Sequence, residues 1–451
     1  MFRRRRTLRW WWALGAVLAA WFAAGPAAAG TWDEEQTLEH DGMTRYFRVY
    51  RPDFQPPEGM PLLFVLHGGG GDMRSFLDNG THAEWPEIAD EEGLLLIVPN
   101  GVDPATGDPS TNDQNWNDCR ADGPRVETGA DDVGFISALI DWADARYPID
   151  PQRVYATGSS NGGLMSYRLA FELSERIAAI APFIANLPAV SECADPRHPI
   201  SVFICNGDGE ETYMPWDGGC VVDKVECERG RVISAEATRE YWIAHNLTEA
   251  GPGEFTAYDD LDPDDGTTAE STLYRRGYEG AEVAFYRIRN GGHVTPSIDH
   301  PRSRLVLQLL GLGLQNHDIE GSRQAWAFLS RQRLSGQGQG TAPGVAGLLR
   351  LRREGPESLR LEWAGDCGDG SEYGIYRGDL RAGYDSLVSE RCSLVDRQAV
   401  IPAGAGGADF FLVVPAGPEG EGSYGFDAAG QPREPAAAPC APLATPDSCA
   451  R

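Results

Sequence analysis

The sequence predicts an α/β fold with a mostly parallel central sheet, followed by a small all-β sandwich. Short apolar runs alternate with helix-like patterns across residues 31–333. Such alternation is typical of a parallel sheet that is covered on both faces by helices. After Arg333 the helical pattern stops, and residues 345–430 show short alternating segments separated by turn residues. That second pattern indicates a β-sandwich.

The elements of the first segment follow in order along the chain. Apolar runs predict strands over residues 46–50, 62–66, 94–98, 154–157, 177–183, 200–205 and 283–288. Helices are expected over 132–147, 164–170 and 322–332. The first of these helices has apolar residues at a spacing close to 3.6, namely Val133, Ile136, Leu139, Ile140 and Ala143.

The two ends of the chain and the join between the domains differ in composition from the rest. Residues 1–29 combine five arginines, an apolar run over 10–24 and Ala27-Ala28-Ala29, which is the pattern of a cleavable signal peptide. We expect a secreted protein, extracellular or periplasmic, with no membrane contact after cleavage. An uncleaved anchor is the alternative, which the shortness of the run disfavours. Residues 334–344 form a Gly/Gln-rich linker, and residues 431–451 form a Pro/Ala-rich tail.

The charge balance excludes some classes of partner. The chain has 39 basic and 67 acidic side chains, a formal net charge of −28. Such a surface repels nucleic acid and anionic lipid but does not oppose neutral polymers. Neither a Cys-x-x-Cys pair nor a His-rich cluster is present, so the sequence predicts no metal and no cofactor.

Nine cysteines in an exported chain predict disulfides and one leftover thiol. Spacing favours four pairs, with Cys205 left as a buried thiol inside an apolar run. The pairs are Cys220 with Cys227, Cys367 with Cys392, Cys440 with Cys449, and Cys119 with Cys193.

Gly158-Ser159-Ser160-Asn161-Gly162 is the most informative stretch for function. It lies between an apolar strand and a helix-like run. A strand, a Gly-x-Ser-x-Gly turn and a helix together form the setting of a nucleophile elbow, which presents a serine hydroxyl at the top of a sheet. Ser160 is the central serine, so the stretch predicts a serine esterase.

Two further motifs fit the same chemistry. His67-Gly68-Gly69-Gly70-Gly71 follows a buried strand, where an HGGG-type loop supplies oxyanion donors. We expect the backbone amides of Gly68 or Gly69, together with that of Asn161, to bind the oxyanion. His293 follows the strand over 283–288 on a glycine turn, which makes it the candidate base.

The acid that orients the base should lie between serine and histidine, after the strand over 200–205. Position favours Glu210, with Glu211 and Asp208 as alternatives. Trp116, in a long polar loop, is interpreted as lining an acyl pocket rather than the core, together with Tyr213 and Trp216.

Two acidic stretches have simpler interpretations. Asp131 is expected to cap the helix that begins near Asp132. The acidic run over 259–266 does not fit an EF-hand loop, so a solvated hairpin tip is favoured over a calcium site.

In combination these motifs resemble the secreted polyhydroxybutyrate depolymerase and feruloyl esterase family of α/β-hydrolases. The matching stretches are LHGGGG at 66–71, DDVGFI at 131–136, GSSNGG at 158–163, the PWDGG that ends at Gly219, and GGH at 291–293. The resemblance implies Ser160 as nucleophile and His293 as base. Members usually carry Asp soon after the strand-end glycine, where this chain has Glu210, or Glu211 if counted back from Pro215. Residues 345–430 resemble a fibronectin-type-III-like module.

The sequence is consistent with two hypotheses of function from different classes. The first is a secreted serine carboxylesterase that acts on feruloyl or acetyl esters of plant polysaccharide, or on polyhydroxyalkanoate. The second is an idle hydrolase scaffold that binds such a polymer, since a fold alone does not fix function. In either case the C-terminal module, with Trp363, Tyr373 and Tyr376, is a candidate polymer-binding part.

Overall fold

The computed structural model of the chain describes residues 30–78, 82–122, 129–222, 227–248, 252–334, 349–353, 358–363, 372–379, 387–394, 398–402, 409–417, 420–421 and 439–440. The predicted signal peptide, nearly all of the linker and nearly all of the tail lie outside these residues. Among the described residues, no helix is both long enough and apolar enough to cross a membrane.

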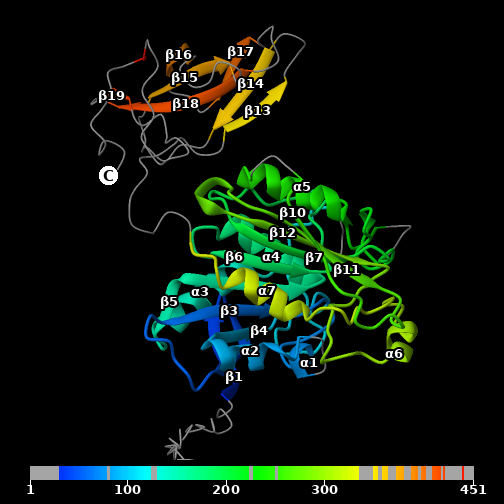
Figure 1. The fold of residues 1–451 in the computed structure, drawn as a ribbon. Helices are drawn as coiled ribbons and strands as arrows, with labels where there is room; N and C mark the ends of the chain where they lie inside the picture. The colour runs from blue at the N-terminus through cyan, green and yellow to red at the C-terminus, as the bar shows by residue number, and fades with distance from the viewer. Residues whose placement is uncertain are drawn as a thin grey trace, which may run out of the picture.

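A ten-stranded sheet forms the centre of the first domain, in the order β1-β2-β4-β3-β5-β6-β7-β12-β11-β10 (Figure 1). Its central strands pair in parallel, and they are β4 (Leu95–Pro99), β3 (Met60–Leu66), β5 (Ile149–Ser159), β6 (Ala179–Phe183), β7 (Ser201–Gly207) and β12 (Val283–Arg289). Antiparallel strands flank them, namely β1 (Thr31–His40), β2 (Met43–Arg51), β11 (Thr268–Tyr274) and β10 (Glu254–Ala257). The predicted mostly parallel sheet is confirmed, and the fold is that of an α/β-hydrolase.

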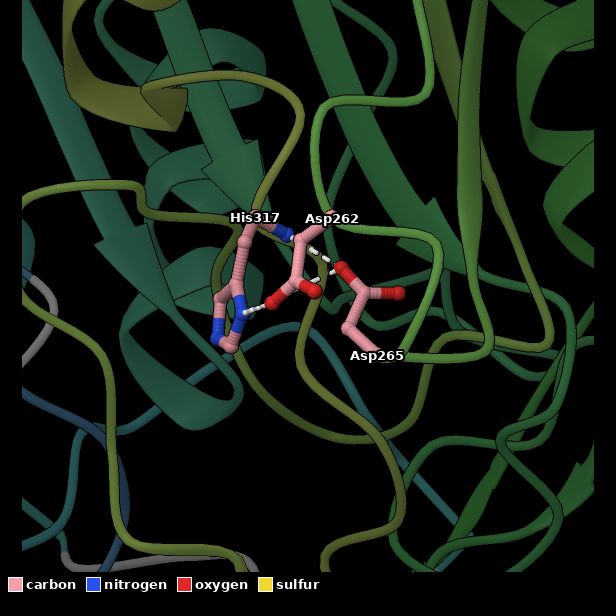
Figure 2. Close-up of side chains that lie close together, drawn as sticks. All are labelled: Asp262, Asp265 and His317. Atoms are coloured by element: carbon pink, nitrogen blue, oxygen red, sulfur yellow. Dashed lines mark hydrogen bonds and ion pairs between the residues drawn. The ribbon is translucent and has the colours of Figure 1, made fainter.

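The hairpin between β10 and β11 contains the acidic run and is less solvated than predicted. Asp265 is 2% exposed. It accepts hydrogen bonds from the backbone and side chain of Thr267 and from the backbone amide of His317. The His317 ring in turn lies 3.0 Å, Nδ1 to Oδ2, from Asp262 (Figure 2). The interpretation as a solvated tip is therefore wrong for Asp265, which fastens the loop to the segment before α7.

Helices cover both faces of the large sheet. One face packs against α3 (Asp132–Asp144), α4 (Asn161–Glu172) and α5 (Ala235–Asn246). The other packs against α2 (Trp85–Glu92) and α7 (Gly321–Leu329). Shorter helices are α1 (Ser75–Asp78), η1 (Tyr278–Gly280) and α6 (Arg304–Leu309), and β8 (Gly219–Cys220) pairs with β9 (Arg231–Val232).

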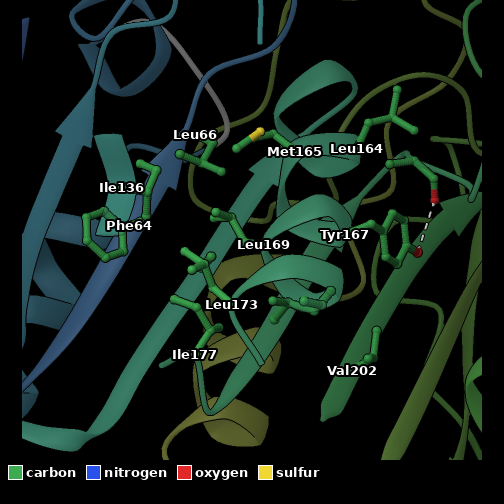
Figure 3. Close-up of a cluster of buried hydrophobic side chains, with 14 of the residues drawn as sticks. Phe64, Leu66, Ile136, Leu164, Met165, Tyr167, Leu169, Leu173, Ile177 and Val202 are labelled. Atoms are coloured by element: carbon green, nitrogen blue, oxygen red, sulfur yellow. Dashed lines mark hydrogen bonds between the residues drawn. The ribbon is translucent and has the colours of Figure 1, made fainter. Parts of the chain in front are cut away.

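The hydrophobic core explains why β3 reads as a continuous apolar run. Leu62, Phe64 and Leu66 face the α3–α4 side, whereas Leu63 and Val65 face the α2–α7 side. Figure 3 shows Phe64 and Leu66 beside Ile136 of α3 and Leu169 of α4. Alternate residues of a strand point to opposite faces, so a strand covered on both sides must be apolar throughout.

Two small sheets form the described part of the C-terminal segment. Strands β13 (Leu349–Arg353), β14 (Ser358–Trp363) and β17 (Gln398–Pro402) make one sheet. Strands β15 (Glu372–Asp379), β16 (Val388–Leu394), β18 (Asp409–Gly417) and β19 (Gly420–Glu421) make the other. Tyr373 and Tyr376 are 2% and 0% exposed, so their proposed contact with a polymer is wrong, because neither ring has a free surface.

The disulfides match the sequence in the first domain and correct it in the second. Cys119 is bonded to Cys193, Cys220 is bonded to Cys227, and Cys205 is a buried free thiol. Cys392 is bonded to Cys440, so the predicted pairs Cys367–Cys392 and Cys440–Cys449 are wrong. Cys440 instead approaches β15, where its amide donates to the Tyr376 hydroxyl. Proximity along the sequence did not decide this pairing, because the folded strands bring distant cysteines together.

A buried ion pair joins β2 to the start of α3. Arg45 NH2 lies 2.6 Å from Asp132 Oδ1, and neither side chain has exposed surface. Asp132 Oδ2 accepts a hydrogen bond from the Asn117 amide at 2.7 Å. Burial raises the pKa of the Asp132 carboxyl, and the charge of Arg45 opposes that rise.

Asp132→Asn is expected to destabilise the first domain by about 3–5 kcal/mol, because it leaves the Arg45 guanidinium buried without a counter-charge. The shift of the urea unfolding midpoint measures this. Asp131→Asn is the matched control, because Asp131 caps the same helix from an exposed position, as predicted, and asparagine caps about as well. Equal unfolding midpoints for the two variants would contradict the assigned role of the pair.

Candidate active site

Three loops meet at one edge of the large sheet. They follow the carboxyl ends of β5, β7 and β12, which lie in the parallel order β5-β6-β7-β12. Parallel strands end at a common edge, so the segments after Ser159, Gly207 and Arg289 are brought close together. In open α/β sheets this edge is where ligands bind.

The first loop is the turn at Ser160. Its backbone has φ 56° and ψ −120°, a conformation that side-chain-bearing residues rarely adopt. A Cβ at Gly158 would lie 2.7 Å from the Gly162 carbonyl carbon, and one at Gly162 would collide with the Leu66 and His67 carbonyl oxygens. The two glycines thus allow β5 to turn directly into α4 beside β3. The strained turn has the geometry of a nucleophile elbow.

Asn161 begins α4, and its side chain is fixed by the loop before α3. Its Oδ1 accepts from the Trp116 amide at 2.7 Å, and its Nδ2 donates to Asp118 Oδ2 at 2.8 Å. Asp118 is fully buried and also binds the Arg120 guanidinium, at 2.8 Å. The backbone amide of Asn161 lies in the first turn of α4, where amides lack intrahelical partners and can bind an anion.

The glycine loop after β3 lies against this turn. The ideal Cβ position of Gly68 is 3.7 Å from Ser160 Cβ, and that of Gly69 is 3.5 Å from Asn161 Cβ. His67 Nδ1 bonds the Gly68 carbonyl at 2.9 Å, while its Nε2 accepts from the Gly101 amide at 3.0 Å. In a trans peptide the N–H points opposite to the carbonyl, so the Gly69 amide points away from the His67 ring.

His67 is therefore a neutral structural residue. Its ring has no exposed surface, and burial lowers its pKa to about 4. With Nε2 accepting from Gly101, the proton is assigned to Nδ1, which donates to the Gly68 carbonyl.

The second and third loops bring Glu210 and His293 together. Glu210 Oε2 lies 3.2 Å from His293 Nδ1, and both side chains are buried. Glu210 Oε1 accepts from the Thr212 and Tyr213 amides at 2.5 and 2.7 Å. The His293 contact is close but poorly aligned for a hydrogen bond, and catalytic contacts of this kind tighten when substrate binds.

Glu210 is held ionised by its surroundings. Burial acts to raise its pKa, but the contact with His293 and the two backbone amides outweigh burial and lower the pKa. The carboxylate therefore remains charged down to acidic pH, as a group that orients an imidazole must.

The other two acidic candidates lie elsewhere. Asp208 binds the Arg287 guanidinium at 2.7 Å and the Asn290 amide at 2.5 Å. Glu211 is exposed. Of the three carboxylates, that of Glu210 contacts the His293 imidazole, at 3.2 Å.

The three predicted pocket aromatics have different environments. Trp116 has no exposed surface, and its indole N–H donates to the His67 carbonyl at 2.9 Å, so the pocket interpretation is wrong and Trp116 belongs to the core. Trp216 is 8% exposed and packs on Phe285 at a centroid distance of 5.7 Å. Tyr213 stacks on the His293 ring at 5.1 Å, and its hydroxyl donates to the Leu310 carbonyl.

A buried contact that the sequence did not reveal connects the serine turn to the histidine loop. His82 Nε2 lies 2.5 Å from Ser159 Oγ and 3.1 Å from Thr295 Oγ1, and the two hydroxyls are 3.4 Å apart. Ser159 precedes Ser160 and Thr295 lies two residues after His293, so the candidate nucleophile and base belong to segments in contact. No motif marks His82, because the connection between α1 and α2 carries no recognisable pattern.

The arrangement has the parts of a nucleophilic acyl-transfer site. A hydroxyl lies on a strained turn, an imidazole is oriented by a carboxylate, and two backbone amides adjoin the turn.

The comparisons with known proteins agree with this chemistry. No family model matches the chain. It is 34% identical over 277 residues to “Putative esterase NocK” of Nocardia uniformis subsp. tsuyamanensis, covering 58% of this chain and 73% of that protein. It is 35% identical over 190 residues to a poly(3-hydroxybutyrate) depolymerase of Ralstonia pickettii, covering 37% of this chain and 35% of that one.

Two further comparisons involve a feruloyl esterase and an acetyl xylan esterase. The chain is 26% identical over 171 residues to feruloyl esterase C of Emericella nidulans, covering 37% of this chain and 55% of that enzyme. Among solved structures, an acetyl xylan esterase from Aspergillus awamori aligns over 62% of this chain and 99% of that one, with 12% identity and a TM-score of 0.39.

Proposed function

This chain belongs to the same esterase family as “Putative esterase NocK”, and from that premise we propose that it is a secreted serine carboxylesterase. One observation carries the proposal. In the buried Glu210–His293 pair, the histidine lies on the loop whose Thr295 contacts Ser159, the residue before the strained turn at Ser160. In this reading Ser160 is the nucleophile, His293 the base and Glu210 the orienting acid.

The reaction follows from these positions. Glu210 holds the Nδ1–H side of His293, which leaves Nε2 to take the proton from Ser160 as its oxygen attacks the ester carbonyl. The amides of Asn161 and Gly69 stabilise the oxyanion, each contributing on the order of 10²–10³ in rate. His293 then protonates the leaving alkoxide, and water releases the acyl group from Ser160 by the reverse steps.

Export is part of the same proposal. The disulfides of the described chain fit an extracellular protein, because disulfides persist in oxidising compartments. The leader pattern over residues 1–29 supports passage across a membrane.

An aliphatic polyester is the substrate that the surface beside the base favours. Helix α6 and the residues after it expose apolar side chains, with Leu305 64% and Leu309 76% exposed, together with Val306, Leu310 and Leu314. This α6 patch adjoins the site, because the Leu312 carbonyl accepts from the His293 amide and the Leu310 carbonyl accepts from Tyr213. Exposed apolar patches mark interaction surfaces, and a polyester is neutral and apolar.

Because Trp116 is buried in the core, it cannot line a pocket for an aromatic acyl group, and a feruloyl ester is less favoured as substrate. A side-by-side assay on polyhydroxybutyrate granules, methyl ferulate and acetylated xylan decides between the substrates. We expect the highest turnover on the granules, and faster release of ferulate or acetate would overturn this choice of substrate while leaving the esterase proposal intact.

The double variant Leu305→Ser with Leu309→Ser is expected to lower activity on polyhydroxybutyrate granules about tenfold. Losing the partial burial of two leucines against the polymer costs about 1.4 kcal/mol of binding free energy. Activity on soluble p-nitrophenyl butyrate should be unchanged. Leu261→Ser is the control, since Leu261 is 61% exposed on the β10–β11 hairpin and is not part of α6. Equal losses of activity on the soluble and the granular substrate would show that α6 stabilises the active site and does not bind the polymer.

A further inference from the structure

Three carboxylates from distant parts of the chain lie close together near the loop that follows His293. Glu84 precedes α2, Asp299 lies in the loop after His293, and Glu320 precedes α7. Their ligand oxygens all lie within 4.8 Å of one another. Glu84 and Glu320 are buried, and Asp299 is exposed at the mouth of the cluster.

Glu84 is the unusual member of this cluster. It is 0% exposed, and neither carboxylate oxygen has a hydrogen-bond partner among the described residues. The Arg323 guanidinium approaches Oε1 only to 3.5 Å, because it pairs more closely with Glu91, at 2.7 Å. A buried ionised carboxylate without donors is costly, and such groups pair or coordinate a metal.

Glu320 retains free acceptor capacity on one oxygen. Its Oε1 accepts from the amides of Ile298 and Asp299 and from the Ser297 hydroxyl. In the part of the chain that the structure describes, its Oε2 accepts from that hydroxyl alone, at 3.0 Å. A carboxylate oxygen has about two acceptor positions, so Oε2 can bind one more partner on the side of Glu84.

We propose that Glu84, Asp299 and Glu320 bind a divalent cation of the Ca²⁺ type. Carboxylate oxygens are the ligands that this hard cation takes, with carbonyls and water completing six to eight positions. The Arg323 guanidinium is shared with Glu87 and Glu91, so it offsets little of the negative charge of the three carboxylates, which a divalent cation would reduce.

The second acidic group of the described chain provides a contrast. Asp265 is already satisfied by Thr267 and the His317 amide, and Asp262 pairs with the His317 ring (Figure 2). Hydrogen bonds within the protein complete that cluster, so no cation is inferred there. A cation bound by Glu84, Asp299 and Glu320 would fasten the loop after His293 to the starts of α2 and α7.

Thermal unfolding of the chelator-treated full chain, with and without CaCl₂, tests the proposal. At about 100 times Kd, calcium should raise the Tm by about 5 °C, and equal ionic strength of NaCl should not. Glu84→Gln and Asp299→Asn should each abolish the shift, and Asp299→Asn folds because the side chain is exposed. Asp262→Asn should retain the shift. Terbium luminescence excited through Trp85, next to Glu84, reports binding directly.

Two results would overturn the proposal. One is a wild-type Tm that calcium leaves unchanged, which would mean that Glu84 and Glu320 share a proton instead. The other is a shift that Asp262→Asn removes and Asp299→Asn retains, which would move the cation to the second cluster. Ester hydrolysis is not the readout, so this test is independent of the proposed function.

Discussion

Replacing Ser160 by alanine is expected to lower kcat on p-nitrophenyl butyrate about 10⁶-fold, with KM nearly unchanged. The variant retains the oxyanion amides and the Glu210–His293 pair but has no atom that can form the acyl intermediate. In a serine hydrolase that loss is about as large as removing the whole triad. Initial rates of hydrolysis measure this loss. The two proteins are compared at equal concentration, determined by a method that does not depend on an intact active site.

Ser159→Ala is the matched control for this prediction. It alters the adjacent serine, whose hydroxyl contacts His82 rather than substrate, and should cost no more than about tenfold, the order of one lost hydrogen bond. Full activity of Ser160→Ala would refute the assigned nucleophile. A wild-type chain that hydrolyses none of the ester substrates would instead favour the idle binding scaffold.

Glu210→Gln is expected to lower kcat about 10⁴-fold, the effect of changing a triad carboxylate to its amide. The amide retains the shape of the side chain but no longer stabilises the imidazolium, and its NH₂ group favours the wrong tautomer of His293. KM should change little, because Glu210 is buried behind the imidazole. Steady-state kinetics over several pH values separate this effect from a shifted pH optimum.

Glu211→Gln distinguishes the two glutamates. Glu211 is exposed and adjacent in sequence, so its variant should differ from wild type by less than about twofold, as for most surface substitutions. A large loss in Glu211→Gln with little change in Glu210→Gln would reverse the assignment.

Most of the fold could be predicted from local patterns of apolar residues. The apolar run over 62–66 and its counterparts are covered on both faces, and that burial forces a continuous apolar sequence that is easy to recognise. The strand β1 was not predicted, because its residues are mostly polar and it pairs on one side only at the sheet edge. Helix α5 was missed for a related reason: its apolar positions are few, and Trp242 supplies much of its burial.

The candidate site was predictable where chemistry fixes both residue type and order. Ser160 and His293 follow strands in the order that the fold requires, and glycines must flank the sharp turn. The position of the acid favoured Glu210 but left Glu211 and Asp208 as alternatives, because these neighbouring carboxylates differ mainly in where their side chains point. That direction depends on Arg287 and on the Thr212 and Tyr213 amides, which local sequence does not place.

The wrong predictions share one physical cause. Trp116 lies in a polar loop, yet the loop folds over α4 and buries the indole against His67. Cys392 bonds to Cys440 because the fold brings these distant residues together. His82 and Glu84 were not singled out, because their partners lie more than 70 residues away in the chain. Contacts between distant segments leave no periodic signal in the sequence.

Peptide mapping after reaction with a fluorophosphonate tests the central claim most directly. The reagent phosphonylates an activated serine, so a mass increase on Ser160 alone, absent in Ser160→Ala and much slower in Glu210→Gln, is the predicted result. Labelling of Ser159 or of another serine, or an active enzyme that takes up no label, would contradict the assignment of Ser160 as the nucleophile.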